Sequence, residues 1–132
     1  RTFPVTPSIA EIYALDAALD RYAKEGPENV WARHAETAAI ARKRLLELGI
    51  ALWPKREAWC APTATAFSLP EGFTDVELRD RLLNEYGILL SLGRGDTSGK
   101  VLRIAHMGAS AQPDFARKTI EALSSILSQS ID

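Results

Sequence analysis

The 132-residue chain contains few of the residues that build common catalytic and metal sites. Its single cysteine, Cys60, excludes an internal disulfide and favours a reducing, cytoplasmic setting. The two histidines, His34 and His106, are far apart and have no cysteine at the spacing of a zinc site. The sequence contains no Gly-x-Ser-x-Gly nucleophile elbow and no Walker loop. We therefore expect no metal site and no self-contained nucleophilic centre.

Charge and hydropathy exclude two further classes of partner. The 16 basic and 17 acidic residues nearly cancel, so the basic surplus that accompanies nucleic-acid binding is missing. No apolar run approaches the roughly 20 residues that span a bilayer, and no signal-peptide pattern opens the chain. We expect neither nucleic acid nor a membrane as a partner. The chain starts with Arg1 instead of Met, and we expect it to be a piece of a longer protein.

The composition present is that of a globular protein, with 46% hydrophobic and 25% charged residues, and residues 1–132 are enough for one domain. Thr6 is the expected N-cap of a first helix with Pro7 at its first position, and Ser8 with Glu11 forms a competing capping box. Hydrophobic spacing and turn residues predict helices at 7–25, 27–48, 75–86 and 113–128 and strands at 50–53, 63–68, 88–91 and 101–105. This order predicts an α+β fold, with helices covering one face of a small, largely antiparallel sheet of about four strands.

Two arginines are the strongest candidates for ligand binding. Side chains alternate along the strand at 101–105, so Arg103 points away from the face of Leu102 and Ile104 and is flanked by small apolar residues. A guanidinium in that position can hold a planar anion through two hydrogen bonds, or it can be a solvated or structurally paired arginine. Arg94 lies between Gly93 and Gly95, in a loop that can approach an anion or simply connect two strands.

Three other residues have plain structural interpretations as well as functional ones. A helix N-terminus is a natural phosphate site, so Thr6 is either a phosphate contact or only a helix cap. His34 lies on an apolar helix stripe and is expected to be packed there. Cys60 has no evident base beside it, which weakens a nucleophilic or redox role.

Several blocks of the sequence resemble the C-terminal part of the class V aminotransferases of the alanine–glyoxylate type, and the resemblance covers essentially the whole chain. The blocks are Phe3-Pro4-Val5-Thr6-Pro7-Ser8, residues 26–34 (GPENVWARH) and Lys100-Val101-Leu102-Arg103-Ile104. Within that family, Gly93-Arg94-Gly95-Asp96-Thr97 and residues 104–108 (IAHMG) look like the pyridoxamine–pyruvate branch. The other alanine–glyoxylate enzymes lack an arginine at the position of Arg94.

This resemblance implies roles for individual residues. Arg103 is similar to the family arginine that holds the substrate carboxylate, and Arg94 to the additional arginine of the pyridoxamine–pyruvate branch. Thr6 is similar to a threonine that contacts the cofactor phosphate in the partner subunit. Phe3 stands where relatives often carry a tyrosine, which weakens phosphate binding. The lysine that forms the Schiff base with pyridoxal phosphate is implied to lie outside this chain, because none of its lysines matches that position: Lys24, Lys43, Lys55, Lys100 and Lys118.

The implied function is part of an aminotransferase, with a fold-type I C-terminal domain that is inactive alone. The expected reaction moves an amino group from pyridoxamine to pyruvate and gives pyridoxal and alanine. In that case no phosphate-bearing cofactor need be bound. The alternatives are an alanine– or serine–glyoxylate enzyme with bound pyridoxal phosphate, and a non-enzymatic module for anion binding or dimerisation. The family implies a homodimer or tetramer for the full-length protein.

Overall fold

The computed structural model describes residues 6–129, and the division between two compact units falls between Ala32 and Arg33. The described elements are four helices and three strands, joined by loops that include short 3-10 turns. Helix α2 (Pro27–Glu47) spans the division. The unit up to Ala32 also contains helix α1 (Ile9–Glu25), and the unit from Arg33 contains the sheet and the remaining helices.

Helix α1 starts two residues later than the Thr6 cap predicts. Ser8 is the N-cap, with the extended angles φ −74° and ψ 99°, and its side chain makes no capping hydrogen bond. Thr6 is therefore not the N-cap, because helical geometry is first adopted at Ile9. The predicted end is confirmed, since the Gly26 N–H donates to the carbonyl of Tyr22 at 2.9 Å.

The apolar stripe of α1 is exposed along its whole length. None of the helix's residues is buried, although the stripe carries large side chains. These are Ile9, Ile12, Tyr13, Leu15, Leu19 and Tyr22. A contiguous exposed apolar surface of this kind is typical of a face that another part of a protein covers.

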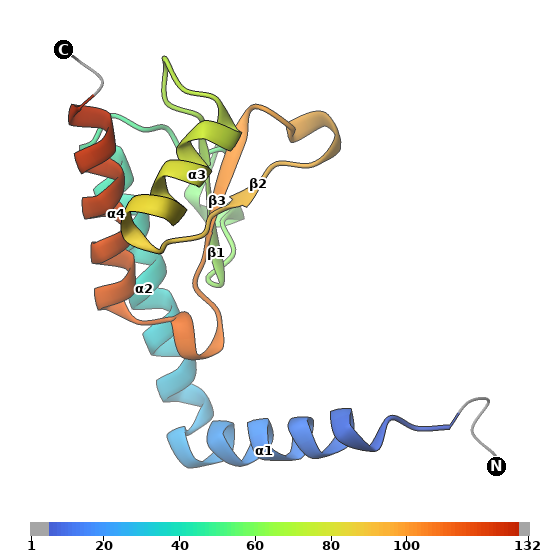
Figure 1. The fold of residues 1–132 in the computed structure, drawn as a ribbon. Helices are drawn as coiled ribbons and strands as arrows, with labels where there is room; N and C mark the ends of the chain where they lie inside the picture. Colours follow the sequence, from blue (N-terminus) through green and yellow to red (C-terminus); the bar gives the residue numbers. More distant parts are fainter. Residues whose placement is uncertain (1–5, 130–132) are drawn as a thin grey trace. The chain divides into compact units, whose positions relative to one another are not determined.

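The second unit is built on a three-stranded antiparallel sheet of order β1-β3-β2 (Figure 1). Strand β1 (Ala64–Ser68) pairs with β3 (Val101–Ala105), and β3 pairs on its other edge with β2 (Ser91–Leu92). Helix α3 (Asp75–Tyr86) connects β1 to β2, and helix α4 (Pro113–Ser128) follows β3. The α+β class and the antiparallel sheet are thus confirmed.

The prediction of about four strands is wrong by one, because the segment at 50–53 makes only a single bridge, between Leu52 and Phe67. On either side of this bridge the Trp53 N–H donates to the carbonyl of Ala66 at 3.0 Å, and the Ser68 N–H donates to the carbonyl of Ala51 at 2.9 Å. The pairing is therefore limited to the residues around Leu52.

The strand predicted at 88–91 is shorter and lies further along the chain, at Ser91–Leu92. Gly87 adopts the left-handed conformation at the C-cap of α3, and the Ile88 N–H donates to the carbonyl of Leu82 at 3.1 Å. After this helix cap the chain pairs with β3 only from Ser91 onward.

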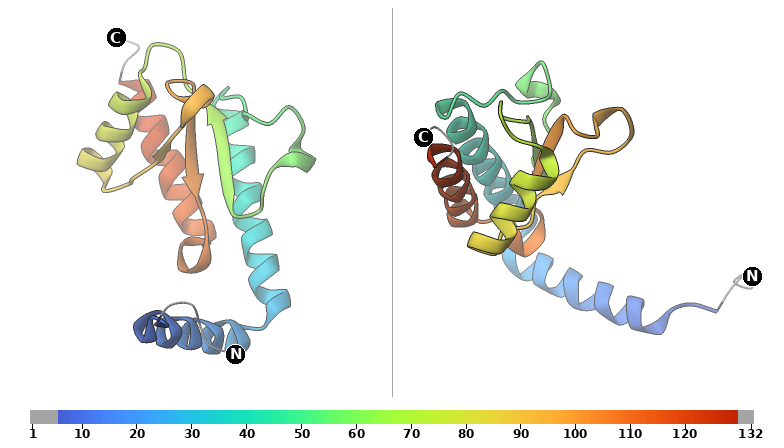
Figure 2. Two further views of the ribbon diagram at one scale, coloured as in Figure 1. Left: turned by 90° about the vertical axis from the view of Figure 1, so that its right-hand side faces the viewer. Right: turned by 45° about the horizontal axis from the view of Figure 1, so that its top comes forward.

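Helices α2, α3 and α4 cover one face of the sheet (Figure 2). The strands present Phe67, Leu102 and Ile104 to them, and the helices contribute leucine, isoleucine and alanine side chains. The opposite, outer face carries the intervening strand residues, including Ala66 and Arg103. This alternation is the one expected from the sequence, and it leaves the outer face open for binding.

The local signals for α3 and α4 are confirmed. The Thr74 side chain accepts a hydrogen bond from the Glu77 N–H at 3.2 Å and so acts as the N-cap of α3. Helix α4 has Pro113 at its first turn and extends to Ser128, as predicted. Among the described residues, no helix combines the length and apolarity needed to cross a membrane.

Candidate functional site

Strand β3 places Arg103 on the outer face of the sheet. Its neighbours Leu102 and Ile104 are buried against the helices, whereas Arg103 itself is exposed. Arg103 lies directly across from Ala66 on β1 and from Ser91 on β2. Both of these residues are small, so neither can cover the guanidinium from the adjacent strand.

The loop after β2 carries Arg94 and is held by its own backbone. The Gly93 N–H donates to the carbonyl of Val101 at 2.9 Å, which keeps the loop against β3. The Thr97 hydroxyl accepts a hydrogen bond from the Arg94 N–H at 2.9 Å and donates one to the Arg94 carbonyl oxygen at 2.8 Å. At Gly93 a Cβ atom would lie only 2.0 Å from the carbonyl oxygen of Thr97, so this position requires glycine.

The structure brings Arg94 and Arg103 together at one hollow of about 260 Å³ on the outer face. Backbone and side chains of β1, β2, β3 and the intervening loop surround it. The residues around it are Trp53, Ala66, Leu92, Gly93, Arg94, Thr97, Val101 and Arg103. Two arginines and no acidic residue are among the residues that line this hollow, so its charge favours an anion.

The two guanidinium groups differ from the other arginines of the same unit. Neither the Arg94 nor the Arg103 side chain makes an ion pair or hydrogen bond with any of residues 6–129. Within residues 33–129, every other arginine contacts a carboxylate, a carbonyl oxygen or an aromatic ring. These are Arg33, Arg42, Arg44, Arg56, Arg79, Arg81 and Arg117. A structural pairing of Arg103 within the described chain is therefore excluded.

Sequence and structure comparisons identify the family. Residues 3–119 match the family described as "Aminotransferase class-V". The chain belongs to the class V aminotransferase family. It is 46% identical over 123 residues to the pyridoxamine–pyruvate transaminase of Mesorhizobium japonicum, with 93% of this chain and 31% of that protein covered. It is 34% identical over 123 residues to the alanine–glyoxylate aminotransferase of Callithrix jacchus, with 93% and 30% covered.

The fold agrees with this assignment. The crystal structure of pyridoxamine–pyruvate aminotransferase from Mesorhizobium loti superposes with a TM-score of 0.92 at 43% identity, covering 98% of this chain and 33% of that one. The chain therefore spans about a third of the length of the relatives that it matches.

In this class V domain, no lysine of the described chain lines the arginine hollow. The Lys100 ammonium group instead donates to the carbonyl oxygen of Asp96 at 3.1 Å, and Lys43 lies 3.9 Å from the carboxylate of Glu47. The residues around the hollow can neutralise an anion, and none of them is a lysine to which pyridoxal phosphate could be covalently attached.

Thr6, the predicted phosphate contact, is an exposed residue in the unit that ends at Ala32. It precedes α1 and does not cap it. Its contact with phosphate stays a prediction. Phe3, the departure from the family tyrosine, lies outside the described residues.

His106, immediately after β3, is a buried residue for which sequence analysis found no role. Its Nε2 atom lies 2.9 Å from the Thr65 hydroxyl of β1, and its Nδ1 atom is buried without a hydrogen-bond partner in the described structure. Burial lowers the pKa of His106, with smaller contributions in the same direction from Arg42 and His34, although backbone hydrogen bonds oppose the shift. A neutral imidazole at this position links β1 to the end of β3 and so supports the strand that carries Arg103.

The side chains of His34 and Cys60 each contact a backbone group of the same unit. The Nε2 atom of His34 accepts a hydrogen bond from the Gly108 N–H at 3.2 Å, which ties α2 to the loop after β3. The Cys60 thiol lies 4.0 Å from the carbonyl oxygen of Arg56. The described residues contain no group of three or more His, Cys, Asp or Glu side chains placed to hold a metal ion.

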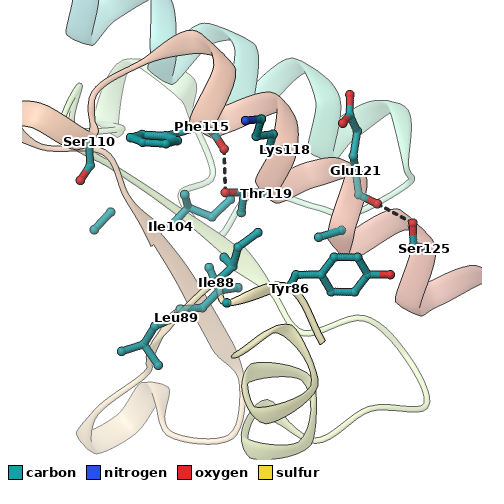
Figure 3. Close-up of a pocket in the computed structure, with 14 residues that line it drawn as sticks. Tyr86, Ile88, Leu89, Ile104, Ser110, Phe115, Lys118, Thr119, Glu121 and Ser125 are labelled. Atoms are coloured by element: carbon teal, nitrogen blue, oxygen red, sulfur yellow. Dashed lines mark hydrogen bonds between the residues drawn. The ribbon is translucent and has the colours of Figure 1, made fainter. Parts of the chain in front are cut away.

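A second cavity lies away from the two arginines. It measures about 660 Å³ and is bounded by the segment from Tyr86 to Leu90 and by α4 (Figure 3). Figure 3 shows apolar side chains along it, among them Ile88, Leu89 and Phe115, beside polar ones such as Thr119 and Ser125. The charged side chains in its lining, Lys118 and Glu121, have opposite signs. This cavity lacks the paired cations that an anionic substrate would need, so the arginine hollow is the better candidate site.

Trp53 is the residue of the site that sequence analysis missed. It lies in the segment at 50–53, for which the sequence predicts a strand but no binding role. Its place beside the arginines depends on pairing between segments far apart in the sequence. Only the alternation of side chains along that segment could have indicated which face it occupies.

Proposed function

We propose that residues 1–132 are the small, substrate-anchoring domain of a transaminase, and that Arg94 and Arg103 bind the carboxylate of a small 2-oxo acid. The observation that carries the proposal is that two arginines, neither with a side-chain partner within residues 6–129, line one hollow. The full-length protein would supply the lysine and the rest of the cofactor site, because this chain spans about a third of its relatives.

The chemistry of the hollow suits a 2-oxo acid. A guanidinium binds a carboxylate through two parallel N–H···O bonds, which fixes the orientation of the acid as well as its charge. Fixed orientation reduces the entropic part of the barrier to amino transfer. In this proposal Arg103 is the principal carboxylate contact, because its strand is rigidly paired on both edges, and Arg94 adds a second cation from the loop.

The proposed amino donor is pyridoxamine and the proposed acceptor is pyruvate, giving pyridoxal and alanine. Support comes from the 46% identical relative named pyridoxamine–pyruvate transaminase and from the presence of Arg94. The alternative is an alanine– or serine–glyoxylate aminotransferase, because relatives with those names match at 34% and 38% identity. When pyridoxal phosphate is bound, it supplies the electron sink for amino transfer.

The assembly and the setting of the enzyme belong to the same proposal. We infer a homodimer or tetramer in the cytoplasm, in which Thr6 contacts cofactor phosphate in the partner subunit if a phosphate is bound. The exposed stripe of α1 supports contact with protein outside this chain. Light scattering on the full-length protein measures the oligomer, and Thr6→Val tests the phosphate contact through the affinity for pyridoxal phosphate.

The proposal is tested by steady-state kinetics of the full-length protein. Arg103→Ala is expected to raise KM for pyruvate by about 10- to 100-fold, since hydrogen bonds to charged groups contribute roughly 1.5–3 kcal/mol. Arg117→Ala is the matched control, because Arg117 pairs with Asp114 on α4 and does not line the hollow. Unchanged KM in Arg103→Ala would exclude the carboxylate role.

A second assay identifies the donor. Pyridoxamine with pyruvate is compared with alanine and glyoxylate in the presence of pyridoxal phosphate. Turnover of the first pair without added phosphate cofactor supports the pyridoxamine reaction. Turnover only in the second assay would assign the glyoxylate reaction. Absence of transamination in both assays would favour the alternative of a non-enzymatic anion-binding module.

A further inference from the structure

Trp53 lies on the same cross-strand row as Arg103. The bridge between Leu52 and Phe67 sets an antiparallel register in which Trp53 is opposite Ala66. The Trp53 N–H donates to the carbonyl oxygen of Ala66 at 3.0 Å, which confirms this register. Ala66 is in turn opposite Arg103 on its other edge. Residues directly opposite one another share a face of a sheet, so all three belong to the outer face.

Ala66 leaves a gap between the two large side chains. Adjacent strands lie about 4.8 Å apart, so the backbones of Trp53 and Arg103 are separated by roughly 10 Å. Between them the sheet presents only a methyl group. Trp53, Ala66 and Arg103 all line the arginine hollow, which therefore has a cationic side, a small floor and an aromatic side.

The indole of Trp53 is not a core side chain. It is 43% exposed and lies outside the cluster of buried residues beneath the helices. Trp59 is 63% exposed. The guanidinium carbon of Arg56 lies 5.1 Å from the centre of the Trp59 ring, so this ring has an arginine of its own as a neighbour. Trp59 does not line the hollow, so the two tryptophans form a matched pair for comparison.

We propose that Trp53 is a specificity-determining residue that limits the length of the 2-oxo acid side chain. This inference rests on the proposed function, in which Arg103 holds the carboxylate. The acid then extends from Arg103 over the methyl group of Ala66 towards the indole. A short side chain fits over Ala66, and each further methylene group meets the rigid ring.

The test compares pyruvate, 2-oxobutyrate and 2-oxovalerate as acceptors for the full-length enzyme with its working amino donor. Trp53→Ala is expected to raise the ratio of kcat/KM for 2-oxovalerate to that for pyruvate by at least about 10-fold, because one methylene in a pocket changes discrimination by roughly 10- to 200-fold. Trp53→Phe, which shortens the ring and keeps it apolar, is expected to give a smaller shift. Trp59→Ala is expected to leave the ratio unchanged.

The outcomes separate this inference from the proposed function. If the wild-type enzyme transaminates pyruvate and the ratio in Trp53→Ala stays within about twofold of wild type, the role of Trp53 is refuted while the proposed function stands. An equal loss of kcat/KM for all three acids would also refute it. If the wild-type enzyme transaminates none of the three, the proposed pyruvate reaction fails, and the inference, which depends on that reaction, fails with it. An equal rise of the ratio in Trp59→Ala would show that the effect is not specific to the hollow.

Discussion

Replacing Gly93 by alanine is expected to damage the site by moving the loop that carries Arg94. The added Cβ would lie 2.0 Å from the carbonyl oxygen of Thr97, whereas Cβ atoms essentially never approach another heavy atom closer than 3.0 Å. The difference of about 1 Å must come from the backbone, because the blocking atom is a carbonyl oxygen and the hydrogen bond from Gly93 to Val101 resists movement. A misplacement of about 1 Å can cost roughly 100-fold in rate.

We therefore expect Gly93→Ala to lower kcat/KM for the 2-oxo acid by about 100-fold in the full-length enzyme. Gly95→Ala is the control in the same loop. Gly95 has φ +56° and no neighbouring atom within 4 Å, so alanine there strains only the local backbone, by roughly 1–2 kcal/mol. Steady-state kinetics and thermal unfolding of both variants separate displacement of the loop from loss of stability. Kinetics of Gly93→Ala within twofold of wild type would refute the reasoning.

Two further predictions concern the stability of this domain. Because burial lowers the pKa of His106 in the folded state, the unfolded chain binds a proton more readily below about pH 6.5, and stability falls as the pH falls through that value. Urea unfolding should show a smaller loss between pH 7.5 and 5.5 in His106→Gln than in wild type; an equal loss would assign the pH dependence to other groups. Thr74→Ala removes the N-cap of α3 and is expected to cost about 1 kcal/mol, whereas Thr74→Ser retains most of it. Equal urea midpoints for the two Thr74 variants would contradict that capping role.

Local signals were sufficient to predict the helices of this domain. The N-cap at Thr74 and the proline at position 113 mark helix starts through interactions within one turn, and both stand at those places in the structure. The outward direction of Arg103 also follows from local alternation along β3. Each of these features depends on residues a few positions apart, which a sequence displays directly.

Features that depend on competition or on pairing over long distances were not predictable. Residues 88–91 have the composition of a strand, yet Ile88 closes the cap of α3 and pairing with β3 begins only at Ser91. At the first helix, two capping positions were available, and the structure adopts the one at Ser8. The row from Trp53 to Arg103 requires the register of β1 with two other segments, which no local pattern determines.

The proximity of Arg94 and Arg103 could be predicted only in part. Nine positions separate them, and a hairpin of unknown register can place such residues together or apart. Resemblance to the family suggested that both contact the substrate, and the structure supplies the physical arrangement in which both line one hollow. Their contact with a substrate still depends on a direct measurement.

That measurement is a double-mutant cycle on the full-length enzyme, with Arg94→Met, Arg103→Met and the double variant assayed for kcat/KM with pyruvate. If both guanidinium groups bind the same carboxylate, the double variant should lose less than the product of the two single losses, with a coupling of about 0.5–3 kcal/mol. Independent, multiplicative losses, or an Arg103→Met variant with unchanged kcat/KM, would contradict a shared carboxylate site in the hollow.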